Sequence, residues 1–368
     1  MERLGRILGH VVSRLTWLCF PFIALLLDRT RFAGLMRPSN VFFKNRGFAV
    51  RDIPSLADKV FVVTGANVGI GFSSSKLLAA AGATVILACR STDKAEQAKA
   101  QIVRGTHCSA ARVVVMHLDN ASLASVKAFS NAFLASFPRL DGLLCNAGGM
   151  EPAHALTADG FERMIGVNHV AHFALCKDLL ALLESTARKQ GAPTAVVFVS
   201  SIAHFASFNL RAALKRGDAA LMDRASFRNP LAYYGASKLM NLLTAKELAR
   251  RQAGSGYNDI GALVAVNAVH PGVVASAFYQ NTFQHSKFLQ GFDAAFGPSV
   301  YWSPEEAALT ALAPLVSPQL LASEHGQYFI PIARSAPSSW QSMDDGLAAE
   351  LWAWTEGVLR ERGYTHEN

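Results

Sequence analysis

The chain of 368 residues is 51% hydrophobic and 17% charged, which excludes a disordered protein and allows a sizeable buried core. The formal net charge of +8 comes without a long run of Lys and Arg, so it argues for a nucleotide-phosphate site or anionic lipid and against nucleic acid. The five cysteines are scattered without a CxxC pair, which excludes a disulfide framework and is typical of a reducing compartment.

An uncharged apolar run, residues 15–27, stands out near the start of the chain. It is shorter than the about 17 to 25 residues of a usual membrane span, and basic residues are denser after it than before it. We expect residues 1–36 to be a membrane anchor that lies in the membrane or barely spans it, with the following domain facing the cytosol at the endoplasmic reticulum or a lipid droplet. A hydrophobic helix packed on the domain and a cleaved signal peptide are the alternatives. Residues 37–57 are expected to be a linker.

Residues 58–333 alternate short β-branched runs with longer helical patterns. Repeated strand–helix units predict a single doubly wound α/β domain with a mostly parallel, seven-stranded sheet. The expected strands are residues 60–63, 84–88, 113–118, 142–145, 195–199, 263–269 and 327–330. The clearest helical patterns are residues 73–81, 122–136 and 239–250. Residues 334–368 are expected to be a C-terminal tail with a helix.

A glycine-rich turn, TGANVGIG over residues 64–71, joins the first expected strand to the first expected helix. Gly65 permits the tight turn, Gly69 lets the backbone approach a pyrophosphate, and Gly71 permits close packing of helix on strand. The helix N-terminus directs free N–H groups at the phosphates. The turn therefore predicts a dinucleotide site, to which these glycines contribute together with the residues between them, Asn67, Val68 and Ile70.

The end of the second expected strand bears on the choice of cofactor. An Asp there would bond the ribose 2′-hydroxyl of NAD, but this chain has Cys89 followed by Arg90. The planar guanidinium of Arg90 suits a 2′-phosphate, so we expect NADP(H). Pairing of Arg90 with a surface carboxylate is the alternative.

Tyr234 and Lys238 lie four residues apart, on one face of an expected helix. A phenol is a poor acid or base near neutral pH, and a nearby ammonium would stabilise the phenolate and lower the phenol pKa. A Tyr and a Lys at this spacing often occur by chance, so the pair is informative only together with other motifs. Three further motifs each follow an expected strand: Asn146-Ala147-Gly148, Ser200-Ser201 and His270-Pro271-Gly272.

The order and spacing of these motifs resemble the short-chain dehydrogenase/reductase family, over roughly residues 58–329. The phrases TGANVGIG, TADGFERMIGVNHVAHFAL, VSSIAH, YGASK and HPGVV are most similar to its retinol-dehydrogenase-like branch, which includes relatives of protochlorophyllide reductase. The resemblance implies a Rossmann fold and nicotinamide-dependent chemistry on a CH–OH or C=O group. It also implies a homo-oligomer formed through helices beside the active site.

The resemblance further implies a role for individual residues. Tyr234 would be the general acid in reduction and the base in oxidation, and Lys238 would bind the nicotinamide ribose and lower the pKa of Tyr234. Ser201 would stabilise charge on the substrate oxygen, whereas Ser200 would be structural. Asn168 would hold a water in the proton relay. The remaining expected cofactor contacts are Asp119 at the adenine amino group, Asn146, Ala147 and Gly148 at the adenosine ribose, and Pro271, Gly272, Val274 and Ser276 near the nicotinamide.

Two features depart from the simplest pattern. Asn120, beside Asp119, stands where the family has an apolar residue. His169, His172 and His204 lack the carboxylate or cysteine partners of a metal site, so no metal is expected and polar contacts at the surface or the pocket wall are predicted for them.

Two insertions, residues 203–231 and 278–302, follow strand ends where ligands bind in open α/β sheets. They are expected to wall the substrate site or cover it; surface decoration is the alternative. The phenylalanines of the second insertion and the apolar N-terminal run favour a lipophilic substrate.

The sequence thus predicts a membrane-associated, NADP(H)-dependent oxidoreductase for a lipophilic carbonyl or alcohol. A non-catalytic scaffold or sensor that binds NADP(H) is the alternative. A sugar-nucleotide epimerase would show a different glycine spacing, and a Rossmann methyltransferase would leave Ser201, Tyr234 and Lys238 without a role.

Overall fold

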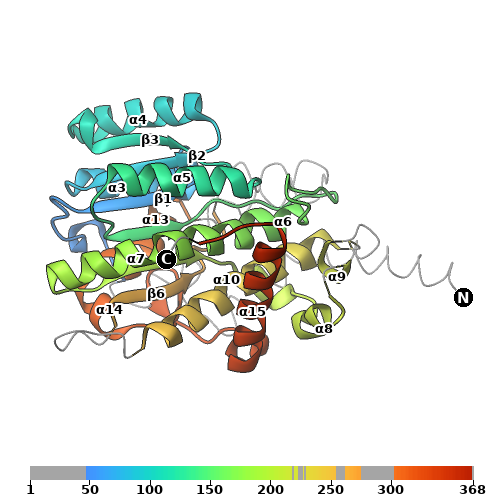
Figure 1. The fold of residues 1–368 in the computed structure, drawn as a ribbon. Helices are drawn as coiled ribbons and strands as arrows, with labels where there is room; N and C mark the ends of the chain where they lie inside the picture. The colour runs from blue at the N-terminus through green and yellow to red at the C-terminus, as the bar shows by residue number, and fades with distance from the viewer. Residues whose placement is uncertain are drawn as a thin grey trace, which may run out of the picture.

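The computed structural model describes residues 47–217, 219–222, 227, 229–253, 262–274 and 302–366. An eight-stranded sheet passes through the middle of this part of the chain and has helices on both faces (Figure 1). The strand order is β3-β2-β1-β4-β5-β6-β7-β8, and all neighbours are parallel except β7 and β8. The strands are β1 (Val60–Thr64), β2 (Thr84–Cys89), β3 (Val113–His117), β4 (Gly142–Cys145), β5 (Thr194–Val199), β6 (Val264–Val269), β7 (Tyr328–Ile330) and β8 (Arg334–Ser335).

The doubly wound fold predicted from the sequence is confirmed, and each of the seven expected strands is present to within one residue at either end. The eighth strand was missed. It comprises only Arg334 and Ser335 and pairs antiparallel with β7, so it is too short to show a periodic pattern.

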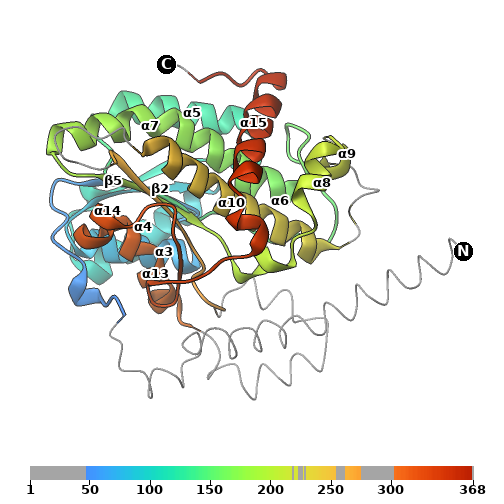
Figure 2. The same cartoon turned by 90° about the horizontal axis from the view of Figure 1, so that it is seen from below.

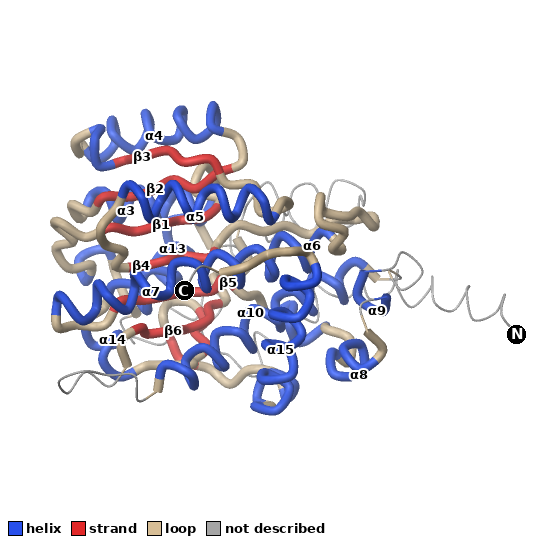
Figure 3. Tube along the Cα trace, in the orientation of Figure 1, coloured by secondary structure: helices blue, strands red, loops and turns tan. Residues whose placement is uncertain are grey.

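The helices cover the sheet in two layers. In Figure 2, α5, α7 and α10 lie on one side of the strands and α3, α4 and α13 on the other. The described helices are α3 (Gly69–Ala80), α4 (Thr92–Thr106), α5 (Leu123–Ser136), α6 (Arg163–Ile165), α7 (Ala171–Gln190), α8 (Leu210–Lys215), α9 (Ala219–Met222), α10 (Pro230–Gln252), α13 (Pro304–Val316), α14 (Pro318–Ser323) and α15 (Asp345–Glu361). The shorter turns are η1 (Val50–Asp52), η2 (Ala110–Arg112), η4 (Ile202–Ala206), η5 (Trp340–Met343) and a π-helical turn, η3 (Gly166–Val170). Figure 3 shows how regularly helix and strand alternate along the chain.

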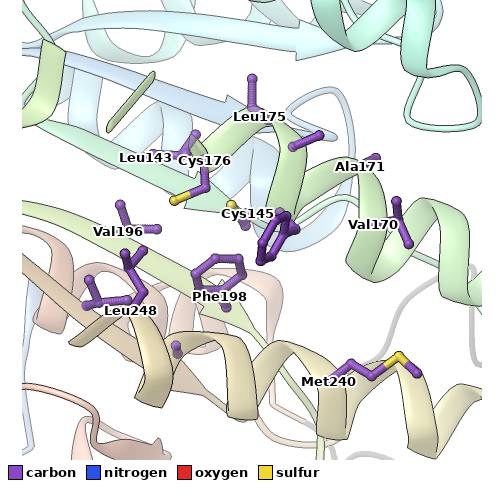
Figure 4. Packing of buried hydrophobic residues seen from close by; sticks show 14 of the residues in the cluster. Leu143, Cys145, Val170, Ala171, Leu175, Cys176, Val196, Phe198, Met240 and Leu248 are labelled. Carbon is purple, nitrogen blue, oxygen red and sulfur yellow. The ribbon is translucent and has the colours of Figure 1, made fainter. Parts of the chain in front are cut away.

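Each helix layer encloses its own apolar core. One core includes Leu143, Phe173 and Leu243, and the other includes Phe61, Leu78 and Leu312. The central strands β1 and β5 are buried along their whole length, which explains why they appear in the sequence as continuous apolar runs. Figure 4 shows the first core, where side chains of β4, β5, α7 and α10 meet.

The segment predicted as a C-terminal tail is part of the packed structure. The ring of Trp352 on α15 meets Phe173 of α7 edge-on at 4.7 Å, and the Arg251 guanidinium of α10 lies 4.4 Å from the centre of the Trp352 ring. The hydroxyl of Thr355 is 3.0 Å from Nε2 of His169. No break in packing therefore coincides with the boundary predicted at residue 333.

The predicted membrane anchor, residues 1–36, lies outside the described residues, as does the first part of the predicted linker. Within the described part of the chain, no helix combines the length and the apolar character that a membrane span needs.

Candidate active site

A cavity of about 790 Å³ lies at the edge of the sheet where the parallel strands end. Its wall includes Gly65 after β1, Arg90 after β2, Asn146 after β4, Ser200 after β5 and His270 after β6. All the predicted catalytic and cofactor-binding residues line it, with two exceptions. Gly71 lies beneath the glycine turn, and Ser276 is outside the described residues, as is most of the second insertion.

The glycine turn leaves one helix end open towards this cavity. Gly65 and Gly69 have φ angles of +64° and +56°, which glycine adopts readily. A Cβ at position 71 would collide with the carbonyl oxygen of Gly65 and with Nδ2 of Asn146. Helix α3 begins at Gly69, and no side chain caps its N-terminus. Its first N–H groups are thus available to an anion, as the sequence predicted.

Thr64 joins the glycine turn to the loop after β4. Its Oγ1 accepts hydrogen bonds from the backbone N–H groups of Asn146 and Ala147, each at 2.9 Å. The Asn146 amide returns a 2.8 Å hydrogen bond to the carbonyl oxygen of Thr64. These hydrogen bonds hold the end of β1 to the loop that follows β4.

Cys89 and Arg90 differ in their surroundings. Burial raises the pKa of the Cys89 thiol, and hydrogen bonds from the backbone N–H groups of Ala66 and Asn67 lower it in part. Arg90 is exposed at the cavity rim, and no carboxylate among the described residues pairs with it. This arrangement disfavours the alternative of a surface ion pair.

The Tyr234 and Ser201 side chains come together across the cavity. Asn229 caps helix α10 by accepting hydrogen bonds from two backbone N–H groups, and Pro230 follows in the first turn. This start places Tyr234 next to η4, where its hydroxyl is hydrogen-bonded to Ser201. Ser200 points elsewhere: its hydroxyl donates to the carbonyl oxygen of Lys238 at 2.7 Å, which is the structural role expected for it.

Lys238 is buried one turn along α10. Its Nζ donates a 2.9 Å hydrogen bond to the carbonyl oxygen of Val199 and lies 5.6 Å from the centre of the Tyr234 ring. Burial lowers the pKa of Lys238 to about 8 and raises the pKa of Tyr234 to about 12, with the Ser201 hydrogen bond acting against the latter. The direction for Tyr234 is opposite to the sequence prediction, because desolvation of the phenol outweighs a cation that lies over the ring rather than at the hydroxyl.

Asn168 lies in the π-helical turn η3, at the entrance to α7. Its Oδ1 accepts from the N–H of Gly149, and its Nδ2 donates to the carbonyl oxygen of Gly149, both at 3.0 Å. The same Nδ2 donates at 2.9 Å to Ser237, whose hydroxyl donates at 2.8 Å to the carbonyl oxygen of Tyr234. The Asn168 amide thus joins the loop after β4 to the catalytic helix, while its part in a water relay stays a prediction.

The prediction of surface or pocket-wall contacts for His169, His172 and His204 was wrong. All three are buried: His169 contacts Thr355 of α15, His172 contacts Thr64 at the end of β1, and His204 contacts Tyr328 of β7 and the backbone N–H of Ser339. His172 contacts Thr64, Asn120 and Asn168, which makes it the central member of a polar cluster behind the cavity. The sequence phrase NHVAH gave only a weak signal for this, the helical spacing of Asn168 and His172. Within the described residues no group of three His, Cys, Asp or Glu side chains is placed to hold a metal ion.

Comparisons with other sequences agree on one family. The short chain dehydrogenase family matches residues 59–215. Human retinol dehydrogenase 13 is 37% identical over 303 residues, which cover 81% of this chain and 84% of the human protein. The short-chain dehydrogenase/reductase drtF of Aspergillus calidoustus is 34% identical over 313 residues, which cover 84% of this chain and 96% of drtF.

A solved structure gives a similar result. The crystal structure of a 3-ketoacyl-(acyl-carrier-protein) reductase from Brucella melitensis, complexed with NADH, has 25% identity and a TM-score of 0.55. The match covers 75% of this chain and 97% of the reductase. The likeness therefore extends over nearly all of that reductase.

Proposed function

This chain belongs to the short-chain dehydrogenase/reductase family, in its retinol-dehydrogenase-like branch, and we propose that it uses NADP(H) to interconvert a lipophilic alcohol and its carbonyl compound. The observation that carries the proposal is the convergence of Ser201, Tyr234 and Lys238 on the cavity that also receives the uncapped end of α3. An acid, a hydrogen-bond donor and a phosphate site in one cavity are what hydride transfer to a carbonyl requires.

The residues present fit a phosphorylated dinucleotide. The N–H groups at the start of α3 suit the pyrophosphate. Arg90 is exposed and has no carboxylate partner within the described residues, so its guanidinium suits a 2′-phosphate. Lys238 lies at the opposite end, beside Tyr234, where it would hold the ribose of the nicotinamide. The nicotinamide ring supplies or accepts the hydride when NADP(H) is bound.

Tyr234 would move the proton. A pKa of about 12 keeps its phenol protonated near neutral pH, so in reduction it gives the proton to the substrate oxygen as that oxygen gains negative charge. Ser201, already hydrogen-bonded to Tyr234, would donate a second hydrogen bond to the same oxygen. In oxidation the Tyr234 phenolate, which the positive charge of Lys238 stabilises, would take the proton back and become the neutral phenol.

The substrate class follows from the rest of the cavity wall. The same cavity is also lined by apolar side chains, which suit a hydrocarbon better than a polar chain: Met150, Met164, Ile202, Leu231 and Val274. Retinol dehydrogenase 13 is a relative, so we infer that a retinoid or a similar long apolar aldehyde is a suitable first substrate.

Membrane association belongs to the same proposal. Ser339 donates a 3.1 Å hydrogen bond to His204, and the neighbouring side chains of Phe205, Trp340 and Met343 are exposed. Exposed apolar groups of this size suit contact with a lipid surface from which an apolar substrate could enter. We propose that the N-terminal segment holds the domain at such a surface, facing the cytosol.

Replacement of the proton donor tests the function. We expect Tyr234→Phe to reduce NADPH-dependent turnover of retinaldehyde in detergent micelles by about a hundredfold or more, while NADPH binding persists. Tyr233→Phe is the matched control, because the Tyr233 ring packs against Phe208 and Phe227 and Tyr233 is not one of the proposed catalytic residues. Loss of the Tyr233 hydroxyl should leave turnover near wild type. Full turnover by Tyr234→Phe would refute the mechanism.

An experiment in cells distinguishes an enzyme from a non-catalytic scaffold. Cells that lack the protein should accumulate a lipid carbonyl compound that wild type clears and Tyr234→Phe does not. Equal rescue by both proteins, with no compound changed, would favour a scaffold that binds NADP(H) without chemistry.

A further inference from the structure

If the cavity binds NADP(H) as proposed, one end of it must receive the adenine base. Ser201 follows β5, on one side of β1, whereas β2 and β3 lie on the other side. A dinucleotide whose phosphates meet the start of α3 and whose nicotinamide meets Ser201 must extend its adenosine half toward the ends of β2 and β3. There the loop after β3 contributes Asp119 and Asn120 to the cavity wall.

The Asn120 amide nitrogen is fully engaged by the protein. Its Nδ2 donates at 3.3 Å to the carbonyl oxygen of Val167 and lies 3.1 Å from Nε2 of His172. A carbonyl oxygen can only accept, so the nitrogen and not the oxygen must face Val167. Asn120 is half-buried, and both of its side-chain hydrogen bonds within the described residues are made by Nδ2, which leaves Oδ1 available to accept.

His172 makes this orientation the only satisfactory one. Its Nδ1 lies 2.9 Å from the carbonyl oxygen of Asn168 and must therefore carry the proton, which leaves Nε2 as an acceptor. Burial lowers the pKa of His172 to about 4, so the ring stays neutral. Nε2 then accepts from Asn120 and from the Thr64 hydroxyl, 2.9 Å away, whose oxygen is already used by two backbone N–H groups. A reversed Asn120 amide would place two acceptors face to face.

We propose that Asn120, positioned by His172, is a base-specificity residue whose Oδ1 accepts a hydrogen bond from the exocyclic amino group of adenine. Asp119 offers a second acceptor, since within the described residues only its Oδ1 is used, by the N–H of Ala121 at 2.9 Å. The two hydrogens of the amino group would then each be donated to an oxygen, one to Oδ1 of Asn120 and one to the Asp119 carboxylate. A base with an oxygen at that position, such as hypoxanthine, would oppose acceptor to acceptor and bind less well.

Binding of two nucleotides measures this preference without any substrate. The probes are NADPH and its hypoxanthine analogue, titrated against the full chain by protein fluorescence. We expect wild type to prefer NADPH and Asn120→Leu to lose about three- to tenfold of that preference, the share of one hydrogen bond. Arg90→Ser is the control, because it should weaken both nucleotides by the same factor.

A second variant tests the positioning by His172. His172→Phe removes the acceptor that orients Asn120, so the preference should fall although Asn120 is present, and Asn120→Leu should add little to it. An unchanged preference in Asn120→Leu would overturn the inference whether or not His172→Phe folds. If wild type binds neither nucleotide, the proposed NADP(H) function fails, and the inference fails with it.

Discussion

In the proposed NADP(H) site, the choice between the two cofactors depends most directly on Arg90. It stands at the cavity rim directly after β2, and the buried Cys89 before it can offer no carboxylate to a ribose hydroxyl. A single guanidinium would therefore distinguish a 2′-phosphate from a 2′-hydroxyl by charge-assisted hydrogen bonding.

Removal of this guanidinium should affect one cofactor only. We expect Arg90→Ser to raise the Kd of NADPH by about tenfold to a hundredfold, since a hydrogen bond to a charged group contributes about 1.5–3 kcal/mol. The Kd of NADH should change by less than about twofold, because NADH has no group for Arg90 to bind. Fluorescence titration with both nucleotides provides the measurement, and equal losses would refute this role.

The sequence predicted which residues line the site far better than it predicted their states. Ser201, Tyr234 and Lys238 were found from motif spacing, because spacing along a helix and after a strand fixes position. The pKa of Tyr234 could not be found this way, since burial depends on the elements that pack around α10. The contacts of His172 with Thr64 and Asn120 join segments distant in sequence and leave no local pattern.

Among the elements, the close packing of α10 on η4 sets the proposed catalytic geometry. Tyr234 and Ser201 face each other only because Gly235 lets the two elements approach closely. A Cβ at position 235 would collide with the carbonyl oxygen of Ala203 and stand 3.0 Å from the backbone nitrogen of Ser207.

A methyl group at this contact should separate the two elements. We expect Gly235→Ala to lower the free energy of unfolding by about 1–3 kcal/mol and to impair turnover together with it. Gly357→Ala is the matched control on α15, where a Cβ would meet nothing within 4 Å; it should raise the free energy of unfolding by about 0.5–1 kcal/mol. Urea denaturation measures both, and a Gly235→Ala protein as stable as wild type would contradict the close contact.

Helix starts were harder to predict than strands for a related reason. The clearest helical pattern covered residues 239–250, and the spacing of Tyr234 and Lys238 predicted helix before it, but α10 begins still earlier, at Pro230. Most of α10 is buried on all sides, so its apolar residues do not recur with the helical period that reveals a helix with one exposed face. The cap at Asn229 and Pro230 was the better signal.

At the scale of the whole molecule, four histidines of the described part of the chain stay neutral in the interior. Burial lowers the pKa of His169 and His270 to about 3 and of His172 and His204 to about 4. In the unfolded chain the same groups titrate near about 6.5. Between these values the unfolded chain binds protons that the folded protein does not, so the free energy of unfolding falls as the pH falls.

Acidification should therefore destabilise the protein well before the carboxylates titrate. We expect the free energy of unfolding to decrease between pH 6.5 and 5.5 by up to about 1.4 kcal/mol for each buried histidine. His270→Leu should reduce this slope, while His117→Gln, at an exposed position, should not. Urea denaturation at pH 7.0 and 5.5 checks the expectation, and equal stability at the two pH values would refute it.

The packing of α15 has a consequence for the order in which the protein is made. Translation delivers α7 and α10 to the ribosome exit before α15, whose Trp352 and Thr355 cover Phe173 and His169. The nascent chain can thus complete the strands and helices that carry Tyr234 while one flank still exposes apolar and histidine side chains to solvent. A chaperone that binds unfolded chains can bind such a flank, and α15 covers it when it packs.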